Sequence, residues 1–170
     1  VSGDATICPG GMATIQATLT GTAPWNLAWS DGVMQNGVMT STATRTVNPA
    51  VTTTYTVTAI SDAVFAAGAS SGSATVTLAS APTIVTDPVV QIVPVGVAAS
   101  FTAAANGTAP LNVQWQESLD NGGTWANIVG ATTATLSLMT TTLADNGKLY
   151  RAQFSNTCGT TNSKPALLNV

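Results

Sequence analysis

The chain contains no histidine, only two cysteines and few charged or aromatic residues among its 170 positions. Without histidine a Ser-His-Asp triad cannot form, and zinc loses its commonest nitrogen ligand. The chain has four Lys and Arg residues and seven Asp and Glu residues. It therefore lacks the basic stripe that binding to a nucleic-acid backbone requires. No apolar run approaches the roughly 18 residues of a membrane helix, and we expect no membrane insertion.

The acidic residues are too scattered for carboxylate chemistry. Glycoside hydrolysis needs two facing carboxylates, and no two Asp or Glu residues are adjacent. We therefore expect no enzyme activity, no catalytic residue and no cofactor. Glu117 and Asp120 could share a calcium ion with loop carbonyls, but so few oxygen ligands favour the absence of a metal. Lys148 and Lys164 have Asn or Asp nearby, as an isopeptide bond requires, yet Lys148 falls in an exposed-looking turn.

Alternation of apolar and polar residues dominates the sequence, and it predicts half-buried strands. Thr, Ser, Asn and Gln take the polar positions, because only 6% of the residues are charged. Turn signals such as Asn121-Gly122 separate the alternating runs. The clearest runs are residues 13–20, 25–30, 54–59, 74–78, 111–116 and 133–138.

A repeated phrase indicates two copies of one module. Residues 21–29 read "GTAPWNLAW" and residues 107–115 read "GTAPLNVQW". Each half of the chain then has about seven short strands, with a Trp that ends the third and a Tyr in the penultimate one, which is typical of an immunoglobulin-like sandwich. The prediction is an all-β chain of two tandem immunoglobulin-like β-sandwiches, residues 1–79 and 84–170, joined by a short linker at 80–83. The expected core residues are Trp29, Trp115, Tyr55 and Tyr150.

The longer motifs carry a family resemblance. The second half reads "VPVGVAASFTAAANGTAP", "VQWQESLDNGGTWANIVGATTATLSL" and "DNGKLYRAQFSNTCGTTNS", and the first half reads "DATICPGGMATIQATLTGTAPW" and "TTTYTVTAISD". These stretches resemble the bacterial immunoglobulin-like repeats of large secreted and cell-surface proteins, of the adhesin or surface-filament type. The resemblance implies a non-enzymatic repeat outside the cell.

The cysteines depart from the pattern of that family, in which a Cys near the first strand commonly pairs within its own domain. Cys8 lies in "ICPGG" and Cys158 in "NTCGT", each without the expected partner in its own half. With Cys8 at the outer end of the first domain, an extended pair cannot join the two, because a disulfide needs Cα atoms within about 7 Å. Three alternatives stay open: free buried thiols, a disulfide between neighbouring copies, or an internal bond in a folded-back chain.

Two aromatic motifs invite a functional interpretation. Residues 118–125, "SLDNGGTW", match an Asp-box through Ser118, Asp120, Gly122, Thr124 and Trp125. We interpret this box as a structural hairpin, in which Asp120 accepts backbone N–H bonds while Trp125 packs below. Trp25 and Trp125 could alternatively serve as stacking platforms for a ligand, although Trp25 shares the inward parity of Trp29.

We therefore expect a rigid spacer or filament building block of a bacterial extracellular surface protein. The expected partners are other copies of the chain or neighbouring repeats, with glycans or cell-surface proteins as further candidates. The alternative is a carbohydrate- or protein-binding module, either an adhesin tip or an accessory domain of a secreted hydrolase. No signal peptide is recognisable, so we expect a mature form or a piece of a longer chain.

Overall fold

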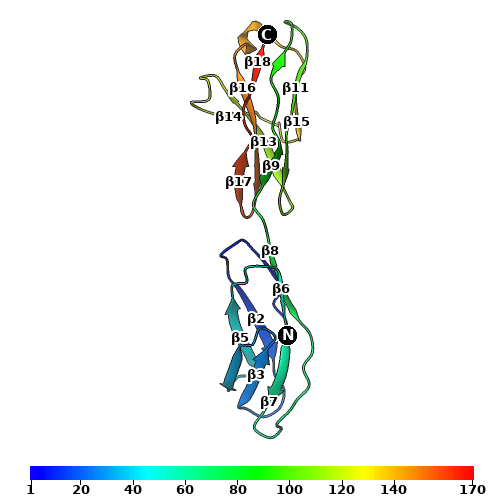
Figure 1. Ribbon diagram of the computed structural model, residues 1–170, viewed down its shortest axis with the longest axis vertical. Helices are drawn as coiled ribbons and strands as arrows, with labels where there is room; N and C mark the ends of the chain where they lie inside the picture. The colour runs from blue at the N-terminus through cyan, green and yellow to red at the C-terminus, as the bar shows by residue number, and fades with distance from the viewer. The chain divides into compact units, whose positions relative to one another are not determined.

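The computed structural model describes residues 1–170, and the chain divides into two compact units, Val1–Ala79 and Ser80–Val170. Strands make up nearly all the regular structure of both units (Figure 1). The one helical element is a three-residue 3-10 turn, Leu143–Asp145, and no helix could cross a membrane. The predicted all-β class is confirmed.

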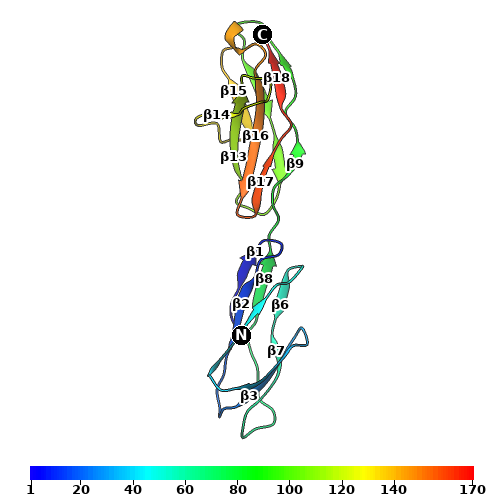
Figure 2. The ribbon, with the colours of Figure 1, turned by 90° about the vertical axis from the view of Figure 1, so that its left-hand side faces the viewer.

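The first unit is a sandwich of two layers (Figures 1 and 2). One layer pairs β2 with β5, and the other contains β1-β8-β6 and β4-β3-β7. Only Thr56 separates β6 from β7, so one extended segment connects β8 to β3. The strands are β1 (Ala5–Ile7), β2 (Ala13–Thr18), β3 (Trp25–Trp29), β4 (Met34–Val38), β5 (Thr42–Val47), β6 (Thr53–Tyr55), β7 (Val57–Ser61) and β8 (Ala74–Leu78).

The second unit has a larger main sheet, ordered β10-β18-β16-β13-β14, with β17 also paired to β16. β11 pairs with β15, and β12 pairs with β9. Its strands are β9 (Thr83–Thr86), β10 (Gln91–Ile92), β11 (Ala99–Thr102), β12 (Ala104–Asn106), β13 (Asn112–Ser118), β14 (Ala126–Asn127), β15 (Thr135–Leu138), β16 (Leu149–Asn156), β17 (Gly159–Asn162) and β18 (Ala166–Asn169).

Each unit encloses its own apolar core, built from the inward positions of the alternating runs. In β2, buried and exposed residues alternate strictly along the strand, as the sequence pattern predicts. In the second unit, the Phe101 ring lies 4.9 Å from the Tyr150 ring and 6.5 Å from the Trp115 ring, between centroids. No buried side-chain nitrogen or oxygen lacks a hydrogen-bond partner, so burial of the two cores leaves no unpaired polar group to oppose folding.

Residues 80–83, the expected linker, belong to the second unit. The carbonyl of Ser80 accepts hydrogen bonds from the Thr108 backbone N–H at 3.2 Å and from Asn156 Nδ2 at 2.7 Å. The Ser80 N–H donates to Thr108 Oγ1 at 2.8 Å, and β9 begins at Thr83. The second "GTAP" turn therefore holds the start of its own unit in place.

Candidate functional site

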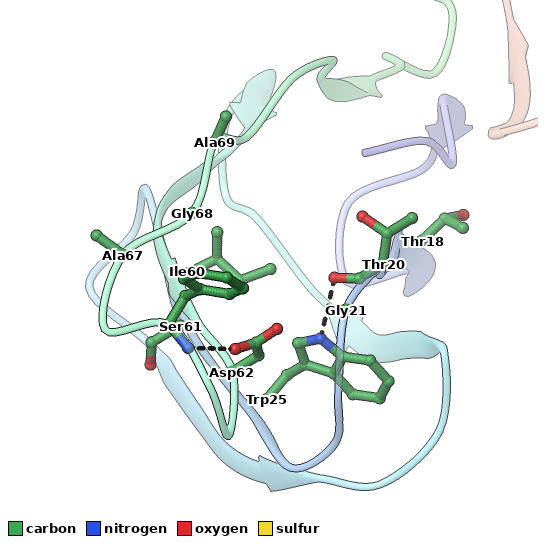
Figure 3. Close-up of a pocket in the computed structure, with 11 residues that line it drawn as sticks. Thr18, Thr20, Gly21, Trp25, Ile60, Ser61, Asp62, Ala67, Gly68 and Ala69 are labelled. Atoms are coloured by element: carbon green, nitrogen blue, oxygen red, sulfur yellow. Dashed lines mark hydrogen bonds between the residues drawn. The ribbon is translucent and has the colours of Figure 1, made fainter.

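A pocket opens at one end of the first unit, between the β2–β3 turn and the long β7–β8 connection (Figure 3). Its cavity volume is about 260 Å³. The turn side contributes Thr20, Gly21 and Trp25, and the opposite side contributes Ile60, Asp62 and Phe65, among other residues. Aromatic and aliphatic walls with a few polar groups are typical of small-molecule sites, and this pocket is slightly smaller than their usual volume of about 300–1,000 Å³.

Asp62 fixes the two loops that form the pocket. One carboxylate oxygen accepts the backbone N–H groups of Val64 at 2.8 Å and Phe65 at 2.6 Å, and the other accepts that of Thr22 at 3.0 Å. These three hydrogen bonds, led by that of Phe65, lower the pKa of Asp62. A Cβ atom on Gly21 would collide with the same carboxylate, and Gly21 has a φ of 114°. The first "GTAP" turn thus requires glycine at this position, and the carboxylate is already used by the backbone.

Trp25 forms a wall of the pocket and is not a free stacking platform. Its side chain is 6% exposed, and its indole N–H donates to the Thr20 carbonyl at 3.2 Å (Figure 3). The exposed aromatic at this pocket is Phe65, which is 66% exposed. Sequence reasoning did not single out Phe65, although a Val-Phe pair followed by the small residues "AAGASSG" is an available signal of an apolar loop tip.

The four expected core aromatics are all buried, with exposures of 1% for Trp29, 0% for Trp115, 4% for Tyr55 and 1% for Tyr150. The two core indoles also have polar partners. Trp29 Nε1 donates to Gln35 Oε1 at 2.8 Å, and Trp115 Nε1 donates to the Thr133 carbonyl at 2.9 Å. Burial raises the pKa of Tyr150 to about 12.

The Asp-box residues form a closed set of local hydrogen bonds. Asp120 Oδ1 accepts bonds from Ser118 Oγ and from the Thr124 N–H, both at 2.8 Å, and Oδ2 accepts the Thr124 hydroxyl at 2.7 Å. The Gly122 N–H donates to Ser118 Oγ at 2.8 Å. These bonds, led by the backbone bond from Thr124, lower the pKa of Asp120 to about 2. A carboxylate whose oxygens already accept these bonds, and whose pKa is so low, is a poor general acid or base at neutral pH.

Trp125 lies half-buried beside this hairpin, beneath an arginine. The Arg151 Cζ atom is 4.1 Å from the Trp125 ring centroid, so the guanidinium covers one face of the indole that a sugar would need. Burial lowers the pKa of Arg151. The two Trp residues considered as platforms lie in different units.

No group of three or more His, Cys, Asp or Glu side chains is placed to hold a metal ion. Glu117 lies 3.6 Å from Lys148 Nζ, and Asp145 lies 2.8 Å from the same nitrogen. Lys148 is thus part of a partly exposed ion-pair cluster, while Lys164 is 85% exposed. Neither lysine is buried beside a carboxyl group, which isopeptide formation would need.

Both cysteines are disulfide-bonded, so the expectation of free buried thiols is wrong. The expected position of Cys8 is also wrong. β1 pairs with β8 in parallel, with Ile7 opposite Leu78, and Cys8 therefore lies at the end of the first unit where the chain leaves it. Cys158 lies in the β16–β17 hairpin, whose Asn156 bonds to Ser80.

Comparison with known proteins gives one family model and one curated relative. A model described as a domain of unknown function, DUF8696, matches residues 91–170, within the second unit. Endoglucanase C of Cellulomonas fimi is 38% identical over 90 residues. That match covers 53% of this chain and 8% of the endoglucanase, so the chain spans only a small part of that relative.

Solved structures of tandem immunoglobulin domains resemble the chain in fold. The Ig1+Ig2 fragment of DIP-gamma gives a TM-score of 0.58 at 16% identity, covering 98% of this chain and 93% of that one. Titin domains I67–I69 give 0.57 at 16% identity, covering 98% and 62%. Sidekick-1 domains 1–4 give 0.58 at 16% identity, covering 100% and 47%. At these identities the likeness shows an immunoglobulin-like fold and nothing further.

Proposed function

We propose that the chain is a non-catalytic structural module of an extracellular bacterial protein, in which two immunoglobulin-like units act as a spacer between other domains. The relation to Endoglucanase C carries this proposal, because 90 matched residues are about the length of one unit and only 8% of that protein. A short shared segment of this kind favours an accessory part of a secreted hydrolase. The bonded cysteines support an oxidising compartment.

Separate cores are what a spacer needs, because each unit then resists unfolding by itself. Single-molecule stretching of the chain under reducing conditions tests this property. We expect two unfolding events, with length gains of about 27 nm for the first unit and about 31 nm for the second, at ~3.4 Å per residue. A single cooperative event would contradict the proposal. So would hydrolysis of a glucan by the chain that is lost in Asp120→Asn or Glu117→Gln.

The cysteines offer a separate test of the compartment and of covalent assembly. We expect no maleimide labelling of the unfolded, unreduced chain and two labels after reduction; labelling before reduction would contradict the bonded state. Linkage between neighbouring copies would appear as a ladder on a non-reducing gel. A single monomer band would reject disulfide-linked copies.

The pocket favours a second candidate, a binding module. Phe65 is exposed at the rim and the walls are already held by Asp62, so a small neutral sugar could enter without rearrangement. Titration with cellohexaose, followed by NMR of the Trp25 indole N–H, tests this candidate. Binding should be lost in Phe65→Ala and kept in Val64→Ala, a change at a neighbouring residue of similar exposure (65%). Unchanged spectra would leave the spacer as the better proposal.

A further inference from the structure

Arg151 differs from every other basic residue of the chain, because it has no acidic partner. No carboxylate oxygen lies within salt-bridge distance of its guanidinium. The other three basic side chains are each paired with a carboxylate: Arg45 with Asp31 at 2.7 Å, Lys148 with Asp145 at 2.8 Å, and Lys164 with Asp87 at 3.6 Å. In a chain with so few charges, one uncompensated cation calls for a physical explanation.

The Arg151 side chain is held in place from two directions. Its Nε donates to Gln116 Oε1 at 2.8 Å, and its guanidinium stacks on Trp125 at 4.1 Å. Gln116 is itself fixed, since it is 8% exposed and its Nε2 donates to Asn127 Oδ1 at 2.8 Å. Neither terminal nitrogen of Arg151 takes part in a hydrogen bond within the protein. These nitrogens form a pre-positioned pair of donors, the geometry that binds a carboxylate through two parallel bonds.

Amide side chains surround this donor pair on the outer face of the main sheet. Strand register places Gln116 opposite Arg151 and Asn127, and Gln153 opposite Gln114 and Asn162. Hydrogen bonds within the protein leave Asn127 Nδ2, Asn162 Nδ2 and Gln153 Oε1 unused. The face thus offers both donors and acceptors. No exposed apolar side chain lies among the outward residues of β13, β16 and β17.

We propose that Arg151 binds a carboxylate group and that this face of the second unit recognises a carboxylated glycan. One fixed arginine suits one carboxylate, and neutral amides of both polarities suit the hydroxyl groups of the adjoining sugars. An acidic peptide fits less well, because the apolar groups beside Arg151 are Leu149, which is half-buried, and Trp125, whose ring the guanidinium covers on one face. This site is independent of the spacer role, since stacking and hydrogen bonding at Arg151 do not require any other domain.

Binding of an oligogalacturonate to the full chain, followed by NMR at the Trp125 indole N–H, tests the proposal. The methyl-esterified oligomer is the matched ligand, because it lacks the charge and keeps the sugar. We expect at least tenfold weaker binding of the ester. Arg151→Gln and Arg151→Lys should each weaken binding of the acid at least tenfold, since Lys keeps the charge without the planar pair of donors. Lys164→Gln, which removes one positive charge elsewhere in the unit, should change it less than twofold.

Four results would overturn the proposal. Equal binding of acid and ester would show that the carboxylate is not recognised, and this comparison needs no variant to fold. Unchanged binding by a folded Arg151→Gln would place the site elsewhere. Tighter binding of poly-glutamate than of oligogalacturonate, lost in the same variant, would assign the site to acidic peptides, and no binding of any probe would refute it altogether.

Discussion

The two arginines of this protein lie in similar surroundings and have different partners. Arg45 in the first unit stacks on Trp29 at 5.4 Å, as Arg151 in the second unit stacks on Trp125 at 4.1 Å. Arg45 also forms a two-point ion pair with Asp31, at 2.8 and 2.7 Å, while Arg151 bonds to the neutral amide of Gln116. Arg45 also lies 5.7 Å from the Tyr55 ring centroid, but the difference that decides the charge of each pair is a carboxylate in one and an amide in the other.

The Arg45–Asp31 pair and the Arg151–Gln116 pair also differ in the parts of the fold that they connect. Arg45 lies in β5 of one layer, and Asp31 follows β3 of the other, so their ion pair joins the two layers of the sandwich. Arg151 and Gln116 lie opposite each other on adjacent strands of one sheet, where backbone bonds already hold the strands together. The ion pair of Arg45 therefore links the two layers, whereas the terminal nitrogens of Arg151 have no partner within the protein.

The largest effect should come from breaking the charged pair. We expect Asp31→Ala to lower the free energy of unfolding of the first unit by about 2 kcal/mol, because it leaves a partly buried guanidinium without its two charged bonds. Urea unfolding followed by the NMR signals of each unit separates the two transitions. Lys164→Ala, which removes the exposed partner of Asp87 and leaves the bond from the Lys164 backbone N–H to Asp87 intact, should cost less than about 0.5 kcal/mol. Equal costs would refute the distinction between the pairs.

An intermediate effect should come from giving Arg151 the carboxylate that it lacks. Gln116→Glu would place an acid at 2.8 Å from Arg151 Nε but lose the bond to Asn127. We expect these changes to offset one another, so that stability shifts by less than about 1 kcal/mol, while oligogalacturonate binding falls at least tenfold. Gln91→Glu makes the same chemical change on β10 and should leave binding intact. If Gln116→Glu still binds oligogalacturonate, Arg151 does not contact the ligand.

The smallest effect should appear in the acid dependence of stability. The pKa of Asp120 is lowered to about 2 by the Thr124 and Ser118 bonds, and that of Asp145 to about 2 by Lys148 and Thr142. Both values lie below the unfolded value of about 3.9. Their contribution is therefore complete above about pH 4 and is lost as the pH falls through about 2.

Thermal unfolding of the second unit between pH 5 and pH 2 measures this loss. Asp120→Asn should flatten the decline, because asparagine accepts hydrogen bonds without titrating. If the thermal stability of that variant falls as steeply with pH, Asp120 does not contribute to the loss of stability in acid. Binding of oligogalacturonate at Arg151 should weaken over the same range in both the parent chain and Asp120→Asn, because the carboxylates of the ligand themselves become protonated.

The fold class could be predicted from two features of the sequence: the alternation of apolar and polar residues, and the Trp and Tyr that recur at matching strands of the two halves. Burial of Trp29, Trp115, Tyr55 and Tyr150 depends on strand parity, which a linear sequence shows directly. The Asp-box bonds also lie within a few residues of one another, and local chemistry was enough to anticipate them. The twofold repeat of "GTAP" is likewise visible in the sequence, and both copies contain a cis Ala-Pro bond.

Other features were decided by the tertiary structure, because they join residues far apart in sequence. The parallel pairing of β1 with β8 set the end at which Cys8 lies, and sequence reasoning placed it at the opposite end. The two "GTAP" turns have different partners, Asp62 in one unit and Ser80 in the other. Strand register brought Gln116 to Arg151 across 35 positions. Side-chain parity is a local property of a strand, but the choice of neighbouring strand and its register is not, and that choice left Arg151 without an acid.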